Sequence, residues 1–190
     1  MGAAGGKGGV VATFEPDSEY PVELHAMNDT VQPIPAGFHT LTPHIVVKGA
    51  DGALDFYANA FGAVLDSIQR SPDGLVMHAT LRIGDSMLLL NDEFPQWGVV
   101  GPETLEGTPI TIQIYCRDVD AAWERARKAG CRIGMELQNA FWGDRYGMLL
   151  DPFGHHWALA QRIENLTPEQ VAEASRRAIG AGAKPEGNEE

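Results

Sequence analysis

The chain repeats itself, and the repeat limits the folds that it can adopt. Residues 44–54 (HIVVKGADGAL) are echoed by residues 113–123 (QIYCRDVDAAW), at an offset of 69 residues (113 − 44). Residues 83–90 (IGDSMLLL) are echoed by residues 153–160 (FGHHWALA), at an offset of 70 residues (153 − 83), and one inserted loop residue explains the difference. Two equivalent units therefore build one domain. We expect a site in the hollow that the two units share.

Apolar spacing and turn residues divide each unit into a strand, a helix and three further strands. In the first unit four apolar residues recur at helical spacing and predict a helix over about 51–61: Leu54, Tyr57, Ala58 and Phe61. Asp51 is expected to cap this helix and Gly62 to end it. Strands are predicted near 43–48, 64–70, 75–83 and 86–91. In the second unit a helix is predicted over 118–129, with strands near 108–116, 132–137, 145–150 and 156–161. The fold class is therefore α+β, with two tandem βαβββ modules.

One domain with two tails is expected for a chain of 190 residues. Residues 1–38 are rich in glycine and proline and predict a flexible N-terminal extension, in which residues 7–13 faintly resemble a phosphate-binding loop. The domain is predicted to span 39–163, with module one at about 41–93 and module two at about 108–162. Residues 164–190 are expected to form a short helix, capped by Thr167, and a polar tail.

Charge and composition exclude several classes of partner. The formal net charge of −12 predicts repulsion of phosphate backbones, so no nucleic acid is expected. The sequence contains no run of 18 apolar residues, so no membrane span is predicted. No signal sequence is recognised either, and a cytoplasmic location is therefore expected. The two cysteines, Cys116 and Cys131, fit neither a disulfide framework nor zinc spacing. Cys116 is expected to be a buried core thiol.

Several stretches, taken together with the tandem repeat, resemble one known superfamily. They are 42–44 (TPH), 77–79 (MHA), 84–86 (GDS), 91–94 (NDEF), 141–147 (FWGDRYG) and 151–157 (DPFGHHW). They are similar to the glyoxalase, bleomycin-resistance and extradiol-dioxygenase superfamily, also called vicinal oxygen chelate, and within it to the PhnB-like branch. The resemblance covers about 40–162. It implies a curved, partly open mixed sheet around a cavity, and it implies a homodimer.

The resemblance also identifies where a metal would bind. Metal-dependent members of the superfamily place one ligand on the first strand of each module and a carboxylate on a last strand. His44 and Gln113 occupy the first-strand positions, but Leu88 and Ala158 stand where the carboxylates would be. If the last strands are shifted by one residue, Leu89 and Leu159 stand at these positions, and their side chains cannot bind a metal either. One imidazole and one amide would hold a dication weakly, so no cofactor is expected, with a divalent metal at His44 and Gln113 as the alternative.

Candidate ligand-binding residues follow from strand alternation and from the repeat. Five of them are expected to line the cavity or a polar sheet face: His44, Gln113, Tyr115, His78 and His156. His155, in the preceding turn, is expected to be exposed to solvent.

Two more candidates come from the stretch 141–147. Arg145, which follows the aromatic residue Trp142, is interpreted either as a clamp for an anionic ligand group or as an ion-pair partner that fixes its loop. Four further residues are predicted to form a rim or lid at the mouth of the cavity: Asp92, Glu93, Phe94 and Trp97.

Three hypotheses for function remain open from the sequence. The leading one is a small-molecule-binding protein, similar to the bleomycin-resistance proteins, that holds a hydrophobic or aromatic compound between the modules without requiring a metal. The second is an enzyme, namely a metal-dependent lyase, isomerase or transferase of glyoxalase type that uses His44 and Gln113. The third is an assembling protein whose cavity is filled by its own side chains. The sequence does not decide whether the chain is catalytic.

Overall fold

The computed structural model describes residues 31–180. The expectations placed on residues 1–30, including those for the stretch 7–13, lie outside the described residues. Of the described residues, 36–180 form one unit by their contacts, and every helix and strand described here belongs to it. Within the described part of the chain, no helix combines the length and the apolar character that a membrane crossing requires.

Each half of the chain forms a βαβββ module. Module one contains β1 (His44–Val47), α1 (Ala50–Phe61), β2 (Val64–Arg70), β3 (Val76–Ile83) and β4 (Ser86–Asp92). Module two contains β5 (Thr111–Tyr115), α3 (Val119–Ala129), β6 (Arg132–Asn139), β7 (Asp144–Leu150) and β8 (His156–Arg162). The connection holds the short helices η2 (Pro95–Trp97) and α2 (Pro102–Leu105), and α4 (Pro168–Gly180) follows module two.

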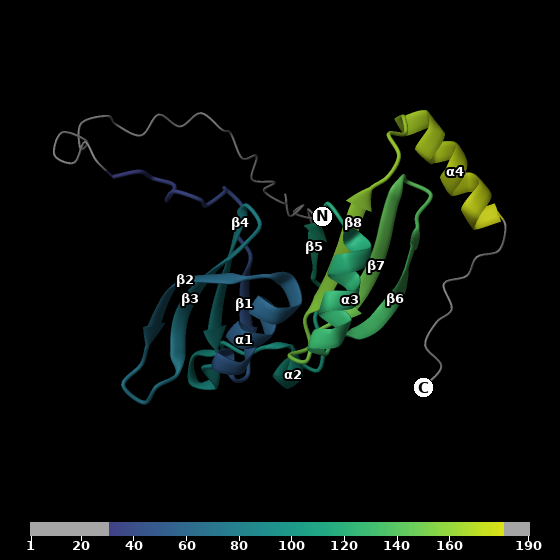
Figure 1. Cartoon of the computed structure of the whole chain (residues 1–190). Coiled ribbons are helices and arrows are strands. Elements are labelled where there is room, and N and C mark those ends of the chain that lie inside the picture. The colour runs from purple at the N-terminus through teal and green to yellow at the C-terminus, as the bar shows by residue number, and fades with distance from the viewer. Residues whose placement is uncertain (1–30, 181–190) are drawn as a thin grey trace, which may run out of the picture. The chain divides into compact units, whose positions relative to one another are not determined.

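The two modules build separate four-stranded mixed sheets with the same topology. The strand orders are β1-β4-β3-β2 and β5-β8-β7-β6 (Figure 1). In each sheet the first and last strands of the module pair in parallel, and the remaining pairs are antiparallel. Neither sheet closes on itself, so β1 and β5 remain edge strands. The predicted α+β fold of two tandem βαβββ modules is confirmed.

The helices begin at equivalent backbone positions, but the predicted cap was wrong. Asp51 does not cap α1, because it forms an ion pair with Arg70 on the surface. The N-terminus of α1 is instead held by Asp92 at the end of β4, whose Oδ1 atom accepts the backbone N–H of Ala50 at 2.8 Å. In module two the Oε1 atom of Gln161, at the end of β8, accepts the backbone N–H of Val119 at 3.0 Å and holds the start of α3 in the same way. The repeat therefore includes the contact between last strand and helix.

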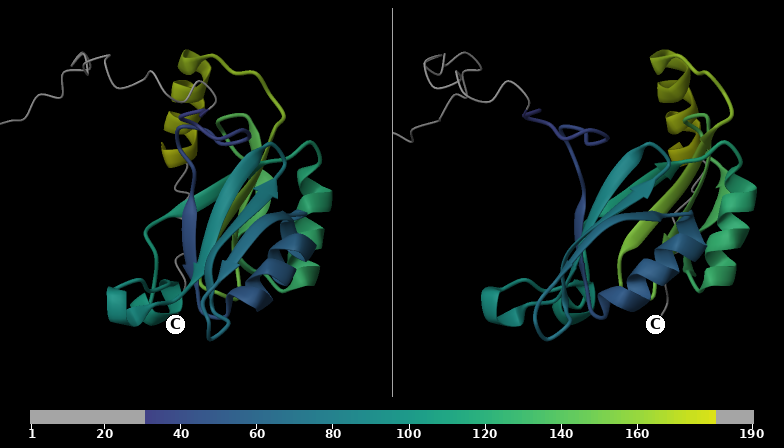
Figure 2. Two further views of the ribbon diagram at one scale, coloured as in Figure 1. Left: turned by 90° about the vertical axis from the view of Figure 1, so that its left-hand side faces the viewer. Right: turned by 60° about the vertical axis from the view of Figure 1, so that its left-hand side comes forward.

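One hydrophobic core runs through both modules. Helices α1 and α3 lie side by side (Figures 1 and 2). Phe61 of α1 packs against Trp157 of β8, with 4.5 Å between ring centroids, and Phe56 meets Phe153 at 5.7 Å. These contacts place side chains of both modules in a single cluster.

Each sheet keeps one face away from its helix. Partners on neighbouring strands point to the same face. His44 is paired with Leu89, and Leu89 with Thr80, so these three residues share the open face of module one. Their neighbours Ile45 and Leu90 point to the other face and are buried in the core. The same alternation applies in module two.

Candidate functional site

A cavity of about 760 Å³ lies between the modules. Module one supplies the approach to β1, the end of α1 and the β3–β4 hairpin, and module two supplies β5 and the first turns of α3. Its lining includes Phe61, Leu88, Arg125, Trp157 and residues 112–117. Its volume falls in the range of pockets that hold small organic molecules.

Most of the cavity wall is apolar, and the order of the strands explains why. β5 is an edge strand, so Ile112 and Ile114, on its helix-facing side, have core residues beneath them and open space beside them. Phe61 and Leu88 close the wall on the side of module one, and Trp157 forms the floor. This surface suits the hydrocarbon part of a ligand.

The polar end of the cavity lies where β5 leads into α3. Cys116, Arg117 and Arg125 meet the cavity there. The Nε–H of Arg125 donates to the carbonyl oxygen of Ala60 at 3.0 Å, a contact that ties α3 to the end of α1. Burial raises the pKa of the Cys116 thiol above its ordinary value, although the nearby Arg125 charge opposes this shift. The thiol is therefore neutral at pH 7. Cys116 packs against the core as predicted, but it is half-buried and not buried.

Two of the sequence-predicted residues, Gln113 and Tyr115, line this cavity. Both side chains are exposed. The Tyr115 hydroxyl donates to Oδ2 of Asp144 at 2.9 Å, and the same oxygen accepts the indole N–H of Trp142 at 3.1 Å. The carboxylate of Asp144 is 1% exposed, and Arg162 lies 3.0 Å from its other oxygen. The buried carboxylate of Asp144 thus holds the Tyr115 side chain in place.

The predicted histidines do not line this cavity. His44 and His78 meet edge to face on the open side of module one, with ring centroids 5.7 Å apart. His156 is paired with Thr111 and with Leu150, which places it on the open face of module two. His155 was predicted to be exposed but is half-buried, because its Nε2 atom lies 3.0 Å from the carbonyl oxygen of Val46. The histidine therefore joins the two modules.

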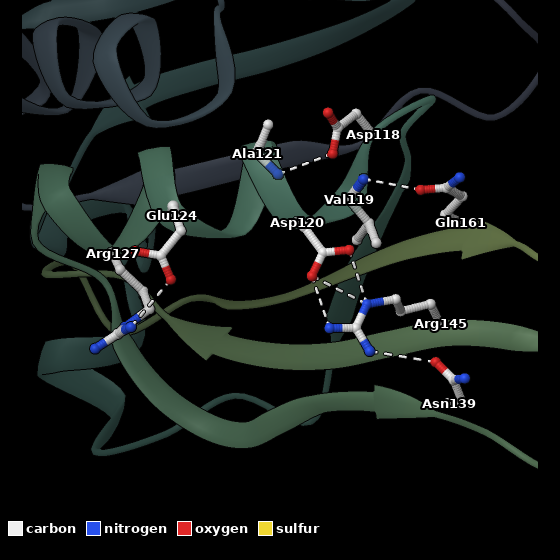
Figure 3. Close-up of polar contacts among 9 residues, drawn as sticks. All are labelled: Asp118, Val119, Asp120, Ala121, Glu124, Arg127, Asn139, Arg145 and Gln161. Carbon is white, nitrogen blue, oxygen red and sulfur yellow. Dashed lines mark hydrogen bonds and ion pairs between the residues drawn. The ribbon is translucent and has the colours of Figure 1, made fainter.

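Arg145 adopts the ion-pair arrangement (Figure 3). Its guanidinium group donates to the carboxylate of Asp120 on α3 with contacts of 2.6 to 3.1 Å, and also to Oδ1 of Asn139 at 3.2 Å. Arg145 and Trp142 lie outside the cavity wall. The arginine links α3 to the edge of its own sheet.

The residues predicted to form a rim have other roles. Besides Ala50, the carboxylate of Asp92 accepts the backbone N–H groups of Gly49 and Val76, so this residue is a buried cap. Oε1 of Glu93 accepts the N–H of Gly101 at 2.7 Å, and a side-chain hydrogen bond with Thr104, together with this backbone bond, lowers the pKa of Glu93. Phe94 is buried and stacks on the exposed Trp97. None of the four lines the cavity.

The residues at the superfamily's metal positions do not fit a divalent ion. His44 faces Leu89 across the strand pair, and Gln113 faces Ala158. No carboxylate stands beside either donor in these pairs. Within residues 31–180 no three residues among His, Cys, Asp and Glu converge as a metal site. Hard and borderline cations need such converging, usually anionic, donors.

Sequence reasoning missed the two arginines of the cavity. Neither Arg117 nor Arg125 was among the predicted site residues. Arg125 comes seven residues after Asp118, the helix cap, and so lies about two turns into α3. The signal that it faces the neighbouring module is a tertiary contact with Ala60, 65 residues away, which no local pattern contains.

Comparison with known proteins identifies the family. Residues 37–159 match the model of the Glyoxalase/Bleomycin resistance protein/Dioxygenase superfamily. The chain therefore belongs to this superfamily, and the predicted family is confirmed. Its sequence is 43% identical over 137 residues to uncharacterized protein Rv0887c of Mycobacterium tuberculosis (strain H37Rv), covering 70% of this chain and 81% of that protein.

Solved structures share the fold. TnmS3, an antibiotic binding protein from Streptomyces sp. CB03234, superposes with a TM-score of 0.51 at 24% identity, covering 70% of this chain and 99% of that chain. The PhnB protein from Bacillus cereus superposes with a TM-score of 0.52 at 20% identity, covering 65% of this chain and 99% of that one. At these identities the likeness concerns the fold.

Proposed function

We propose that the protein binds a small organic molecule in the cavity between its modules and needs no metal to do so. The single observation that carries the proposal is a cavity of about 760 Å³ whose wall is mostly apolar and comes from both modules. Burial of a ligand's apolar surface against such a wall stabilises a complex by about 25 cal/mol per Å² before the costs of association.

The chemistry of the cavity supports binding rather than turnover. The histidines that were predicted to bind a ligand, His44, His78 and His156, stand outside its wall. The thiol of Cys116 is held neutral by burial, so it is a poor nucleophile. Binding by a superfamily member is in keeping with TnmS3, which shares the fold and is described as an antibiotic binding protein.

Pocket filling provides the test. Purified protein is screened by thermal shift against hydrophobic and aromatic compounds, and hits are titrated by calorimetry. Ile114→Trp places an indole in the cavity, whereas Ile133→Trp adds the same bulk on β6, outside it. Compounds should bind the wild type and Ile133→Trp but not Ile114→Trp. Equal binding to both variants, or no binding compound at all, would contradict the proposal.

We further propose that the protein is a cytoplasmic homodimer. The open face of module two carries Met135 and Tyr115, with Phe141 at its end, and all three are substantially exposed. Exposed apolar side chains in such number often mark an interface. Size-exclusion chromatography with light scattering tests the dimer, and Met135→Lys is expected to shift it toward the monomer. A wild-type protein that runs as a monomer at micromolar concentration would exclude it.

A further inference from the structure

We propose that the ligand of the cavity is an amphipathic organic anion, a monocarboxylate with a hydrocarbon body, which Arg117 and Arg125 recognise. This inference rests on the proposed function, because it names the chemical class of the ligand for the same cavity.

The two arginines have donors left for a ligand. Arg125 uses its Nε–H on the carbonyl oxygen of Ala60, and this bond fixes the orientation of the guanidinium plane. Among the described residues, neither Arg117 nor the Nη atoms of Arg125 have a hydrogen-bond or ion-pair partner. Guanidinium groups bind carboxylates through paired N–H donors. Arg125 is therefore oriented in advance for an anion.

The acidic residues of the cavity wall are engaged elsewhere. Oδ1 of Asp118 accepts the backbone N–H of Ala121 at 3.0 Å and caps α3. Oδ1 of Asp85 accepts the hydroxyl of Ser86 at 3.0 Å in the β3–β4 turn of the other module. The remaining titratable groups of the wall are His39, Cys116 and Tyr115. Two arginines and two aspartates line the cavity, so its wall has no net formal charge, whereas the whole chain carries −12.

The wall next to the arginines suits a hydrocarbon and not a second charge. Ile112 and Ile114 of β5 continue from the polar end toward Phe61, Leu88 and Trp157. The neutral thiol of Cys116 adds polarisable surface without a negative charge that would repel a carboxylate. A ligand with one anionic head and one apolar body satisfies both parts of the cavity.

Decanoate and decanol form a matched pair of probes, because they share a hydrocarbon chain and differ in the charged head. Calorimetric titration at pH 7.5 should show decanoate binding at least about tenfold more tightly than decanol, as expected for hydrogen bonds to a charged group. In Arg117→Gln/Arg125→Gln the preference for decanoate over decanol should fall to about twofold or less. Arg132→Gln removes a positive charge outside the cavity and should keep the full preference.

Alkylation of Cys116 locates the probe. Bound decanoate should slow the reaction of Cys116 with N-ethylmaleimide, measured by mass spectrometry, and the buried Cys131 serves as the internal reference. Because Arg125→Gln loses a contact with α1, Arg117→Gln alone is a second variant whose exposed side chain has no such contact.

The outcomes separate the two proposals. Equal affinities for decanol and decanoate would overturn the anion inference and leave the proposed function standing. The anion inference would also fail if decanoate bound without protecting Cys116, or if the preference survived in the double variant. Binding of neither probe, together with a negative compound screen, would overturn both.

Discussion

The hydroxyl of Tyr57 on α1 donates a 2.7 Å hydrogen bond to Oδ2 of Asp151, which follows β7 in the other module. The same carboxylate is 1% exposed and accepts the indole N–H of Trp157 and the backbone N–H groups of Phe153 and His155. One carboxylate therefore organises the β7–β8 turn and attaches it to module one. A buried charge of this kind is tolerated because its oxygens have donors.

Removal of the Tyr57 hydroxyl tests this attachment. Tyr57→Phe keeps the ring in the core and leaves Asp151 three donors, so we expect the free energy of unfolding to fall by about 1–2 kcal/mol in urea titrations. Tyr146→Phe is the matched control, because no hydrogen bond of the Tyr146 hydroxyl is found among the described residues, and its effect should stay within about 0.5 kcal/mol. Equal effects of the two changes would contradict the role given to Tyr57.

The two contacts that hold the start of a helix to the last strand of its module should differ in strength. Asp92 accepts three backbone N–H groups in a buried position, whereas Gln161 accepts one from Val119 in a partly buried position. We expect Asp92→Ala to cost about 3 kcal/mol or more and Gln161→Ala about 1 kcal/mol of the free energy of unfolding. Asp92→Asn, which keeps one acceptor oxygen, should fall between them. Chemical denaturation measures all three, and a larger loss for Gln161→Ala would refute the ranking.

Local patterns gave the modules and their order, because periodicity and turn residues report directly on strands and helices. The failures share a cause. Asp51 was expected to cap α1 because it stands at the right place along the chain, but Asp92 does so from 42 residues away. His155 was placed in solvent, but it contacts Val46 across 109 residues. Contacts between residues far apart along the chain, whether within a module or between modules, depend on how the elements pack, and no local signal specifies that packing.

Arg145 should contribute little to stability. Its partner Asp120 is largely exposed, and exposed ion pairs typically contribute no more than about 1 kcal/mol. We therefore expect Arg145→Gln to lower the free energy of unfolding by less than about 1 kcal/mol, and the loss to shrink further in 1 M salt. Asp120→Asn should behave alike, since it removes the same pair. A loss of ligand affinity in Arg145→Gln alone would instead assign this residue to binding.

Stability should fall in alkaline solution. Burial raises the pKa of Cys131 from its ordinary value of 9.0 to about 12, and that of Tyr57 is raised too. The folded protein then holds protons that the unfolded chain releases above pH 9, so the free energy of unfolding decreases as pH rises toward 12. The Cys131 contribution amounts to at most about 1.4 kcal/mol per pH unit. Cys131→Ala should flatten the decline measured between pH 9 and 10.5, and an unchanged slope would exclude this origin.

The core that runs through both modules also affects how the protein unfolds. Phe61 and Trp157 belong to different copies of the repeat, yet each covers the other. If the chain were divided between Leu105 and Thr111, each half would expose its share of that aromatic cluster to water. We therefore expect the two modules to unfold together in a single cooperative transition. The segment that is duplicated along the sequence is thus smaller than the unit that folds.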